Sequence, residues 1–176
     1  VLELAKRVST EKILFTSTRE IYLKTNNIES IRESDSGTID PLSYRSCYPE
    51  SKRLAESLLK SYSVQYGVNF NSLRIAHTYG PGMKIESDGR VMADLINYAS
   101  KSIDIQLNSD GQAMRAFCYI SDAIDAIFRI LIHGNNNEAF NIANETEPIS
   151  ILKLSHLIQK IAGKNNTVKL PKEHNK

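Results

Sequence analysis

Short apolar segments with the length of buried strands alternate with longer segments of helical periodicity along this chain. Phe70 to Ile75 is a strand candidate, and apolar residues from Ser51 to Tyr66 recur at helical spacing up to Gly67, a residue type that commonly ends helices. A last amphipathic helix is expected from Ile151 to Ala162, with Ser150 as its N-cap. This alternation predicts an α/β fold with a mainly parallel sheet.

The remaining elements follow the same pattern. We expect a helix already under way at Leu2 to Val8, strands at Ile13 to Phe15, Ile103 to Leu107, Phe117 to Ile120 and Phe140 to Ala143, and helices from Val91 to Lys101 and from an N-cap at Ser121 to Ile132. The polar segment from Asn26 to Leu42 is predicted to be a loop.

Composition excludes several other classes of protein. Apolar residues make up 41% and charged residues 24% of the 176 residues, as in ordinary globular chains, which corresponds to one domain or part of a larger one. No apolar run approaches the ~18 residues of a membrane span, so no membrane partner is expected. The net charge of +2 is too small to indicate a nucleic-acid partner.

Cysteine and histidine indicate neither a disulfide scaffold nor a metal site. Cys47 and Cys118 lie in aromatic or apolar surroundings, so buried free thiols in a reducing, cytoplasmic compartment are expected. The 4 histidines share no metal-ligand spacing, and we expect no bound metal.

Tyr48 and Lys52 form the first candidate site. Side chains four residues apart at a helix start project from one face, and Pro49 is tolerated in a first turn. An ammonium near a phenol favours the phenolate, which could take a proton from a substrate alcohol. On spacing alone, an exposed helix pair is the favoured interpretation.

Thr18 and Glu20 form a second candidate group. Thr18 closes a predicted strand, and open α/β sheets place ligands at the carboxyl ends of their strands. Its hydroxyl could bind the same substrate oxygen as Tyr48, or could simply cap a helix. Glu20 could serve as an acid or base, or be a solvated loop charge.

Taken together, six ordered motifs resemble the extended short-chain dehydrogenase/reductase family, and within it the NAD-dependent nucleotide-sugar epimerases, dehydratases and decarboxylases. The motifs are Thr18-Arg-Glu-Ile-Tyr22, Tyr48-Pro-Glu-Ser-Lys-Arg-Leu-Ala-Glu56, Leu73-Arg-Ile-Ala-His-Thr-Tyr-Gly-Pro-Gly82, Asp88-Gly-Arg-Val91, Arg115-Ala-Phe-Cys-Tyr-Ile-Ser-Asp122 and Phe140-Asn-Ile142. The resemblance covers about Leu2 to Gly163.

The resemblance implies the C-terminal portion of a Rossmann-type parallel sheet plus a small α/β substrate-binding lobe. Residues 1–80 would form the remaining half of the NAD-binding domain, residues 81–170 mainly the sugar-nucleotide lobe, with segments returning to the sheet, and residues 171–176 a tail. The family's opening Gly-rich phosphate-binding turn has no counterpart here, so we expect a chain that lacks this portion, binds NAD poorly and is inactive alone.

The resemblance also assigns roles. Tyr48 would be the catalytic base, Lys52 would tune it and hold the nicotinamide ribose, and Thr18 would be the hydroxyl partner. Glu20 matches a Glu shared by dehydratases and decarboxylases, whereas Arg19 stands where dehydratases carry Asp. The NAD-binding residues would be Ser17, Tyr48, Lys52 and Ile75, and the substrate-binding residues His77, Arg90, Val91 and Arg115, of which Arg90 and Arg115 suit a diphosphate.

The implied reaction oxidises the sugar C4 hydroxyl to a transient ketone. The Arg45-Ser-Cys-Tyr48 lead-in favours a UDP-glucuronate decarboxylase over a nucleotide-sugar 4-epimerase, which remains the alternative together with a non-catalytic sugar-nucleotide-binding fragment. The expected partners are a nucleotide-diphosphate sugar, with a UDP-sugar favoured, and a second copy of the chain, because relatives pair the helix that carries Tyr48 across a homodimer.

Overall fold

The computed structural model describes residues 1–23, 30–163 and 167–171 of the chain. Two compact units can be distinguished. Unit 1 comprises residues 1–78 and 121–143, and unit 2 comprises residues 79–120 and 144–176. Part of the predicted loop from Asn26 and most of the predicted tail from residue 171 lie outside the described residues.

Unit 1 is built on a three-stranded parallel sheet. Its strands are β1 (Ile13–Thr18), β2 (Phe70–Ile75) and β7 (Glu138–Ile142), in the order β1-β2-β7. The register places Thr18 beside Ile75, so the carboxyl ends of β1 and β2 are level. The predicted α/β fold with a parallel sheet is thereby confirmed.

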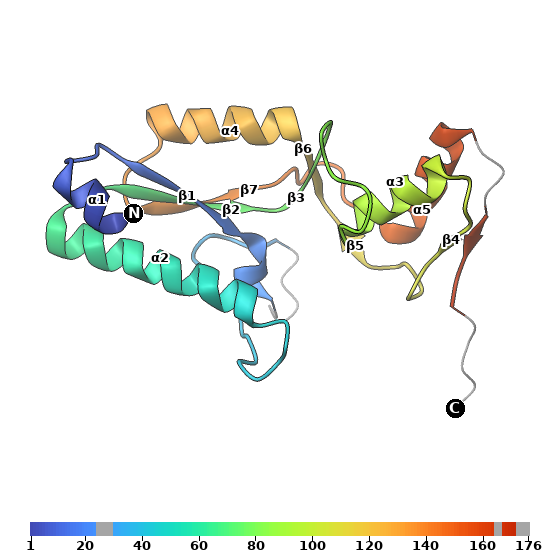
Figure 1. Cartoon of the computed structure of the whole chain (residues 1–176), viewed down its shortest axis with the longest axis horizontal. Helices are drawn as coiled ribbons and strands as arrows, with labels where there is room; N and C mark the ends of the chain where they lie inside the picture. Colours follow the sequence, from blue (N-terminus) through green and yellow to red (C-terminus); the bar gives the residue numbers. More distant parts are fainter. Residues whose placement is uncertain (24–29, 164–166, 172–176) are drawn as a thin grey trace. The chain divides into compact units, whose positions relative to one another are not determined.

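Helices cover both faces of this sheet. Figure 1 shows α2 (Cys47–Tyr66) on one face and α4 (Ile120–His133) on the other. The short helix α1 (Leu2–Arg7) packs against α2, and the 3-10 helix η1 (Arg19–Tyr22) follows β1 directly. The sheet edge that carries β1's carboxyl end is therefore flanked by η1 and α2.

Two local predictions in unit 1 were wrong. Cys47 is exposed, because it is the first residue of α2 and this turn faces solvent, whereas Cys118 is buried as expected. Ser121 is not an N-cap, because α4 begins one residue earlier at Ile120 and the Ser121 hydroxyl bonds the Asp122 carboxylate instead, at 3.2 Å.

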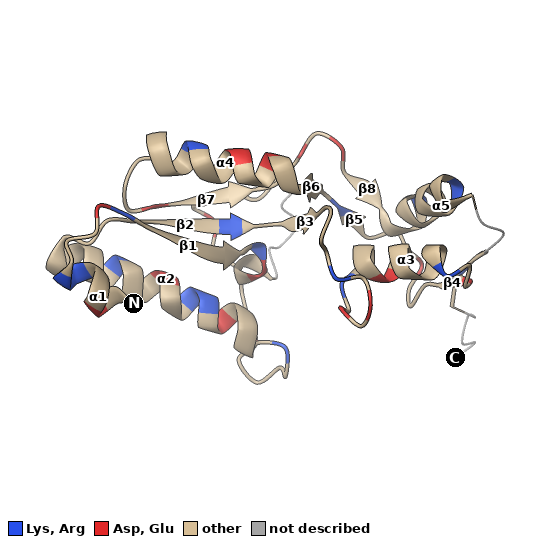
Figure 2. Ribbon diagram, turned by 45° about the horizontal axis from the view of Figure 1, so that its top comes forward, with Lys and Arg blue, Asp and Glu red and all other residues tan. Residues whose placement is uncertain are grey.

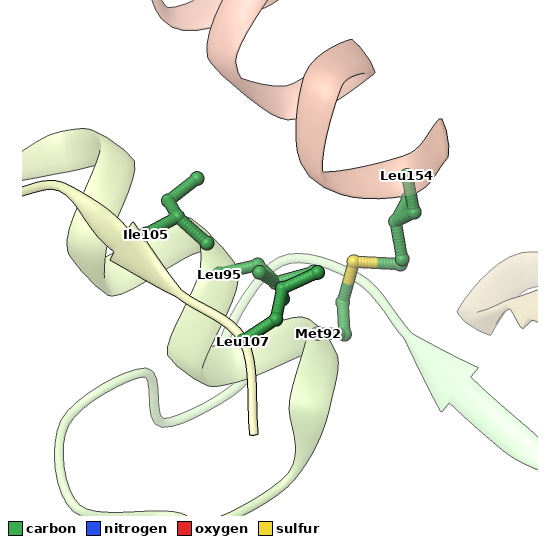
Figure 3. Packing of buried hydrophobic residues seen from close by; sticks show 5 residues of the cluster. All are labelled: Met92, Leu95, Ile105, Leu107 and Leu154. Atoms are coloured by element: carbon green, nitrogen blue, oxygen red, sulfur yellow. The ribbon is translucent and has the colours of Figure 1, made fainter. Parts of the chain in front are cut away.

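Unit 2 packs two helices against short strand pairs. Its elements are α3 (Val91–Ser100), β4 (Ile105–Gln106), β5 (Met114–Arg115), β6 (Phe117–Tyr119), β8 (Ile149–Ser150), α5 (Ile151–Ala162) and β9 (Val168–Lys169), and β3 (His77–Tyr79) leads into it. β4 pairs with β9 in parallel and β5 with β8 antiparallel. The core cluster in Figure 3 consists of Met92, Leu95, Ile105, Leu107 and Leu154.

The last helix has the ends that the sequence predicts. The Ser150 hydroxyl accepts a hydrogen bond from the backbone N–H of Lys153 at 3.2 Å, which is the N-cap contact. Gly163 follows with a φ of 61°, a left-handed conformation that costs glycine little. Both ends of α5 therefore follow from local side-chain chemistry.

Acid is expected to weaken the β4–β9 pairing. The Lys169 ammonium, followed by the backbone N–H of Thr167, lowers the pKa of Asp104 to about 2 from its ordinary value of 3.8. Because the folded-state pKa is depressed, this carboxylate stabilises unit 2 above pH about 4, and the contribution is lost as the pH falls towards about 2. Unfolding followed at several acidic pH values should show this loss, and Asp104→Asn should reduce it. An identical pH dependence in Asp104→Asn would contradict the assignment.

Within the described ranges, no helix is both long and apolar enough to cross a membrane. The same ranges contain no cluster of three or more His, Cys, Asp or Glu side chains that could hold a metal ion.

Candidate active site

The carboxyl end of β1 carries the first candidate side chains. β1 extends three residues beyond the predicted Phe15, so Ser17 and Thr18 are part of the sheet, and both are buried. The Thr18 hydroxyl accepts a hydrogen bond from the Glu20 backbone N–H at 3.2 Å and caps η1. The cap fixes the turn that carries Glu20, a half-buried carboxylate immediately beyond the strand.

Tyr48 and Lys52 lie in the first turns of α2, which packs against β1 and η1. The Lys52 ammonium donates a hydrogen bond to the Thr16 carbonyl at 2.7 Å and lies 5.8 Å from the centre of the Tyr48 ring. Lys52 therefore faces β1 and Tyr48 together and is not simply part of an exposed helix pair. The Tyr48 side chain is 48% exposed, so a substrate can reach it.

Two further candidate site residues lie at or just beyond the carboxyl end of β2. Ile75 is the last residue of β2 and is paired in register with Thr18. His77 follows in β3 and is half-buried. Unit 1 thus brings Ile75 next to the strand end that carries Ser17 and Thr18, whereas the roles of Ile75 and His77 remain predictions.

The end of β1 also fits the nicotinamide cofactor that the sequence motifs imply. The hydroxyl of Ser17 is buried and has no hydrogen-bond partner among the described residues. Such a group is costly unless a partner is supplied. Together with the Lys52 ammonium and the accessible Tyr48 phenol, it offers hydrogen-bonding groups for a nicotinamide and its ribose.

The remaining candidates, Arg90, Val91 and Arg115, belong to unit 2. Arg90 precedes Val91, the first residue of α3, and its guanidinium forms an exposed ion pair with Asp88 that raises the pKa of Arg90 and lowers that of Asp88. Arg115 lies in β5, and its Nη1 donates to the Met114 carbonyl at 2.8 Å. The candidate catalytic groups and the candidate diphosphate-binding arginines are thus carried by different units.

Sequence reasoning did not identify the polar network beneath this site. Arg74 of β2 forms a two-pronged ion pair with Glu56 of α2, with Nε–Oε1 at 3.2 Å and Nη2–Oε2 at 2.7 Å. Its Nη1 donates to the Tyr22 hydroxyl at 2.7 Å, and that hydroxyl donates to Asn141 at 2.8 Å. Figure 2 shows the charged residues along α2 and a basic segment within β2. The one signal available was a charged residue, Arg74, within a predicted strand.

Burial and hydrogen bonding shift the pKa values of the groups in this network in opposite directions. Burial disfavours the charge of Arg74, but the hydrogen bonds to Glu56 and Tyr22 outweigh it, so the pKa of Arg74 is raised. Burial also raises the pKa of Tyr22, although Arg74 and Asn141 oppose that shift. Arg74 is therefore charged and Tyr22 is neutral at physiological pH.

Comparisons with known proteins identify the family of the chain. A model of the NAD dependent epimerase/dehydratase family matches residues 1–143. UDP-glucuronic acid decarboxylase 3 from Arabidopsis thaliana is 37% identical over 170 residues, which cover 97% of this chain and 48% of that protein. The chain therefore spans about half the length of this relative.

Solved structures share the fold. The UDP-glucose 4-epimerase from Thermotoga maritima with UDP-glucose has a TM-score of 0.79 at 23% identity, over 99% of this chain and 55% of that one. The Thermus thermophilus UDP-glucose 4-epimerase in complex with NAD has a TM-score of 0.81 at 24% identity, over 99% and 56%. The cofactor expected from the sequence, NAD, is thus the one named for the family and bound in a structure of this fold.

Proposed function

Because the chain belongs to the NAD dependent epimerase/dehydratase family, we propose that it forms the catalytic and substrate-binding part of a nucleotide-sugar-modifying enzyme that decarboxylates UDP-glucuronate. The observation that carries the choice of reaction is the 37% identity to a UDP-glucuronic acid decarboxylase along 97% of the chain. The solved epimerases are less than 25% identical and support the fold alone.

Tyr48, Thr18 and Lys52 are proposed to act on the sugar hydroxyl at C4. Tyr48 takes the proton of this hydroxyl, Thr18 hydrogen-bonds the same oxygen, and the Lys52 ammonium lies beside the base. Ser17, Lys52 and Ile75 would hold NAD, whose nicotinamide would accept the hydride that leaves C4. The contact between Lys52 and the end of β1 supports this arrangement, because it holds the ammonium beside both the base and the strand.

The ketone explains why a uronic acid can lose its carboxylate. With a carbonyl at C4, the carboxylate on C5 belongs to a β-keto acid, so the electrons of the breaking C5–C6 bond can enter the carbonyl and CO₂ leaves. The resulting enolate is protonated at C5, and returning hydride to C4 completes the pentose. Glu20, two residues after Thr18, is proposed to act as an acid or base for the group at C5.

Unit 2 is proposed to bind the diphosphate of the substrate. Guanidinium groups are permanently charged and can bind phosphate through two hydrogen bonds, so Arg90 and Arg115 suit this role, with Val91 and His77 contacting the nucleotide sugar. Arg90 already balances Asp88, so substrate binding would exchange or share this partner.

Because the chain alone is expected to bind NAD poorly and to be inactive, the proposed reaction is tested in a full-length enzyme in which the family's Gly-rich NAD-binding portion accompanies this chain. This enzyme is supplied with NAD and UDP-glucuronate, and in parallel with UDP-glucose, which has no carboxylate. Release of CO₂ and formation of a UDP-pentose from UDP-glucuronate alone is the expected result. Conversion of UDP-glucose to UDP-galactose without CO₂ release would replace decarboxylation by 4-epimerisation. If calorimetry shows that a UDP-sugar binds but neither UDP-sugar is turned over, the protein would have a binding role in place of a catalytic one.

A homodimer that uses α2 is also proposed. Leu54 and Leu58 lie one turn apart on α2, with exposures of 62% and 45%, and form an apolar stripe suited to a second copy. Light scattering is expected to give twice the monomer mass, and Leu54→Glu with Leu58→Glu is expected to give a monomer with an unchanged circular-dichroism spectrum. A wild-type protein that is already monomeric would contradict this proposal.

A further inference from the structure

We infer that Arg74 is a positioning residue, which holds α2, the helix with the candidate base, against β1 and η1. The inference rests on the proposed function, because it concerns the geometry of the same site. Arg74 acts through two neighbours, Glu56 on α2 and Tyr22 on η1.

The contact with α2 is made one turn beyond Lys52. Glu56 follows Lys52 by four residues, so both side chains project from the same face of the helix. The two parallel hydrogen bonds from Arg74 fix the orientation of the Glu56 carboxylate as well as its distance. Rotating or sliding α2 would break these two hydrogen bonds, so they also fix where Lys52 meets the Thr16 carbonyl.

The contact with η1 uses the third nitrogen of the same guanidinium. Tyr22, the last residue of η1, is 3% exposed, and its hydroxyl accepts from Arg74 and donates to Asn141. The backbone of Gly37 lies so close to Tyr22 that a Cβ there would overlap the Tyr22 carbonyl. Tyr22 is therefore confined, and with it the turn that carries Glu20.

Arg74 can contact both α2 and η1 because it lies on β2, the middle strand of the sheet. It is paired in register with Ser17 of β1 and with Asn141 of β7. The side chains of Arg74 and Glu56 are only 12% and 15% exposed, so water and salt screen their attraction little. A lysine would have one compact charge in place of the three guanidinium nitrogens of Arg74. It could not hydrogen-bond Glu56 and Tyr22 with the same geometry.

The variant for the test removes both charges together. Arg74→Met with Glu56→Leu leaves no unpaired charge in the interior, and such replacements commonly preserve folding. Arg74→Lys is measured beside it, because it keeps the positive charge but not the two parallel hydrogen bonds. The matched control is Arg129→Met with Asp125→Leu, which removes an ion pair of α4 whose side chains are 74% and 61% exposed.

The first readout needs no turnover. Crystal structures of the wild type and the variants are superposed on β1, β2 and β7, and the Lys52 Nζ–Thr16 carbonyl distance is compared with 2.7 Å. The hydrogen bond should be broken in the double variant and in Arg74→Lys, and kept in the control. Retention of this contact and of the position of Tyr48 in either Arg74 variant would overturn the inference.

The second readout separates positioning from substrate binding. With UDP-glucuronate and the full-length enzyme that carries this chain, kcat should fall about tenfold or more in both Arg74 variants while KM changes less than about twofold, the signature of an interaction needed in the transition state alone. An unchanged kcat would overturn the inference while leaving the proposed function intact. A wild type that turns over no UDP-sugar would count against the proposed function, and the crystallographic comparison would still decide the role of Arg74.

Discussion

Replacing Tyr48 by Phe is expected to lower the turnover of UDP-glucuronate about 10²- to 10⁴-fold, the range lost when a general base is removed. The reason is chemical, because phenylalanine keeps the ring but has no group to receive the proton of the C4 hydroxyl. The fold should be unaffected, because among the described residues the Tyr48 hydroxyl has no hydrogen-bond partner and the side chain is 48% exposed. Initial rates of CO₂ release and thermal unfolding measure the two effects.

The matched control for this variant is Tyr44→Phe. Tyr44 lies in the same lead-in to α2 and is 91% exposed, so removing its hydroxyl should change neither rate nor stability. Tyr48→Phe with a rate within about threefold of the wild type would remove Tyr48 from the mechanism, since a lost base costs far more. A rate lost equally in both variants would point to the whole segment instead of the Tyr48 hydroxyl.

Replacing Leu73 by Ala is expected to lower the free energy of unfolding by about 2–5 kcal/mol, the usual cost of truncating a buried leucine. Leu73 is 1% exposed and lies in the middle of β2, paired in register with Thr16 on one side and Phe140 on the other. A cavity there has strands on both sides, so the sheet cannot easily close around it. Urea unfolding followed by circular dichroism measures the loss, because the chain has no tryptophan.

Leu42→Ala provides the comparison for the core variant. Leu42 is 93% exposed, so the same truncation there should change stability by no more than about 0.5 kcal/mol. Hydrogen exchange of the β2 amides should accelerate in Leu73→Ala and not in Leu42→Ala. Equal losses in the two variants would show that the sheet does not pack on Leu73 as the structure indicates.

The elements that the sequence predicted best are those whose signals are local. β2 runs from Phe70 to Ile75 and α5 from Ile151 to Ala162, as expected. For α5 the reason is that a serine cap and a terminal glycine act within a few residues. β1 was predicted too short, since Thr16 to Thr18 are polar and enter the sheet through pairing with β2. A strand edge of this kind depends on a neighbour some sixty residues away in the chain.

In the candidate site, too, local sequence signals predicted some features, whereas others depend on packing. Spacing and motif order identified Thr18, Tyr48 and Lys52, and the structure places them on elements that pack together. The motifs could not show that Lys52 contacts the Thr16 carbonyl or that Ser17 is buried without a partner among the described residues. The sequence also could not predict that Cys47 is exposed to solvent, because apolar neighbours in the sequence do not show which side of a helix turn faces water.

The sequence by itself determined the α/β class, the ends of α5 and the family's ordered motifs, because each depends on residue types at short, fixed spacings. Only the tertiary structure decided how these parts are held, above all through Arg74, whose partners Glu56 and Tyr22 are 18 and 52 residues away. Hydrogen bonds over such separations form only after strands and helices have packed. No local pattern specifies which side chains then meet.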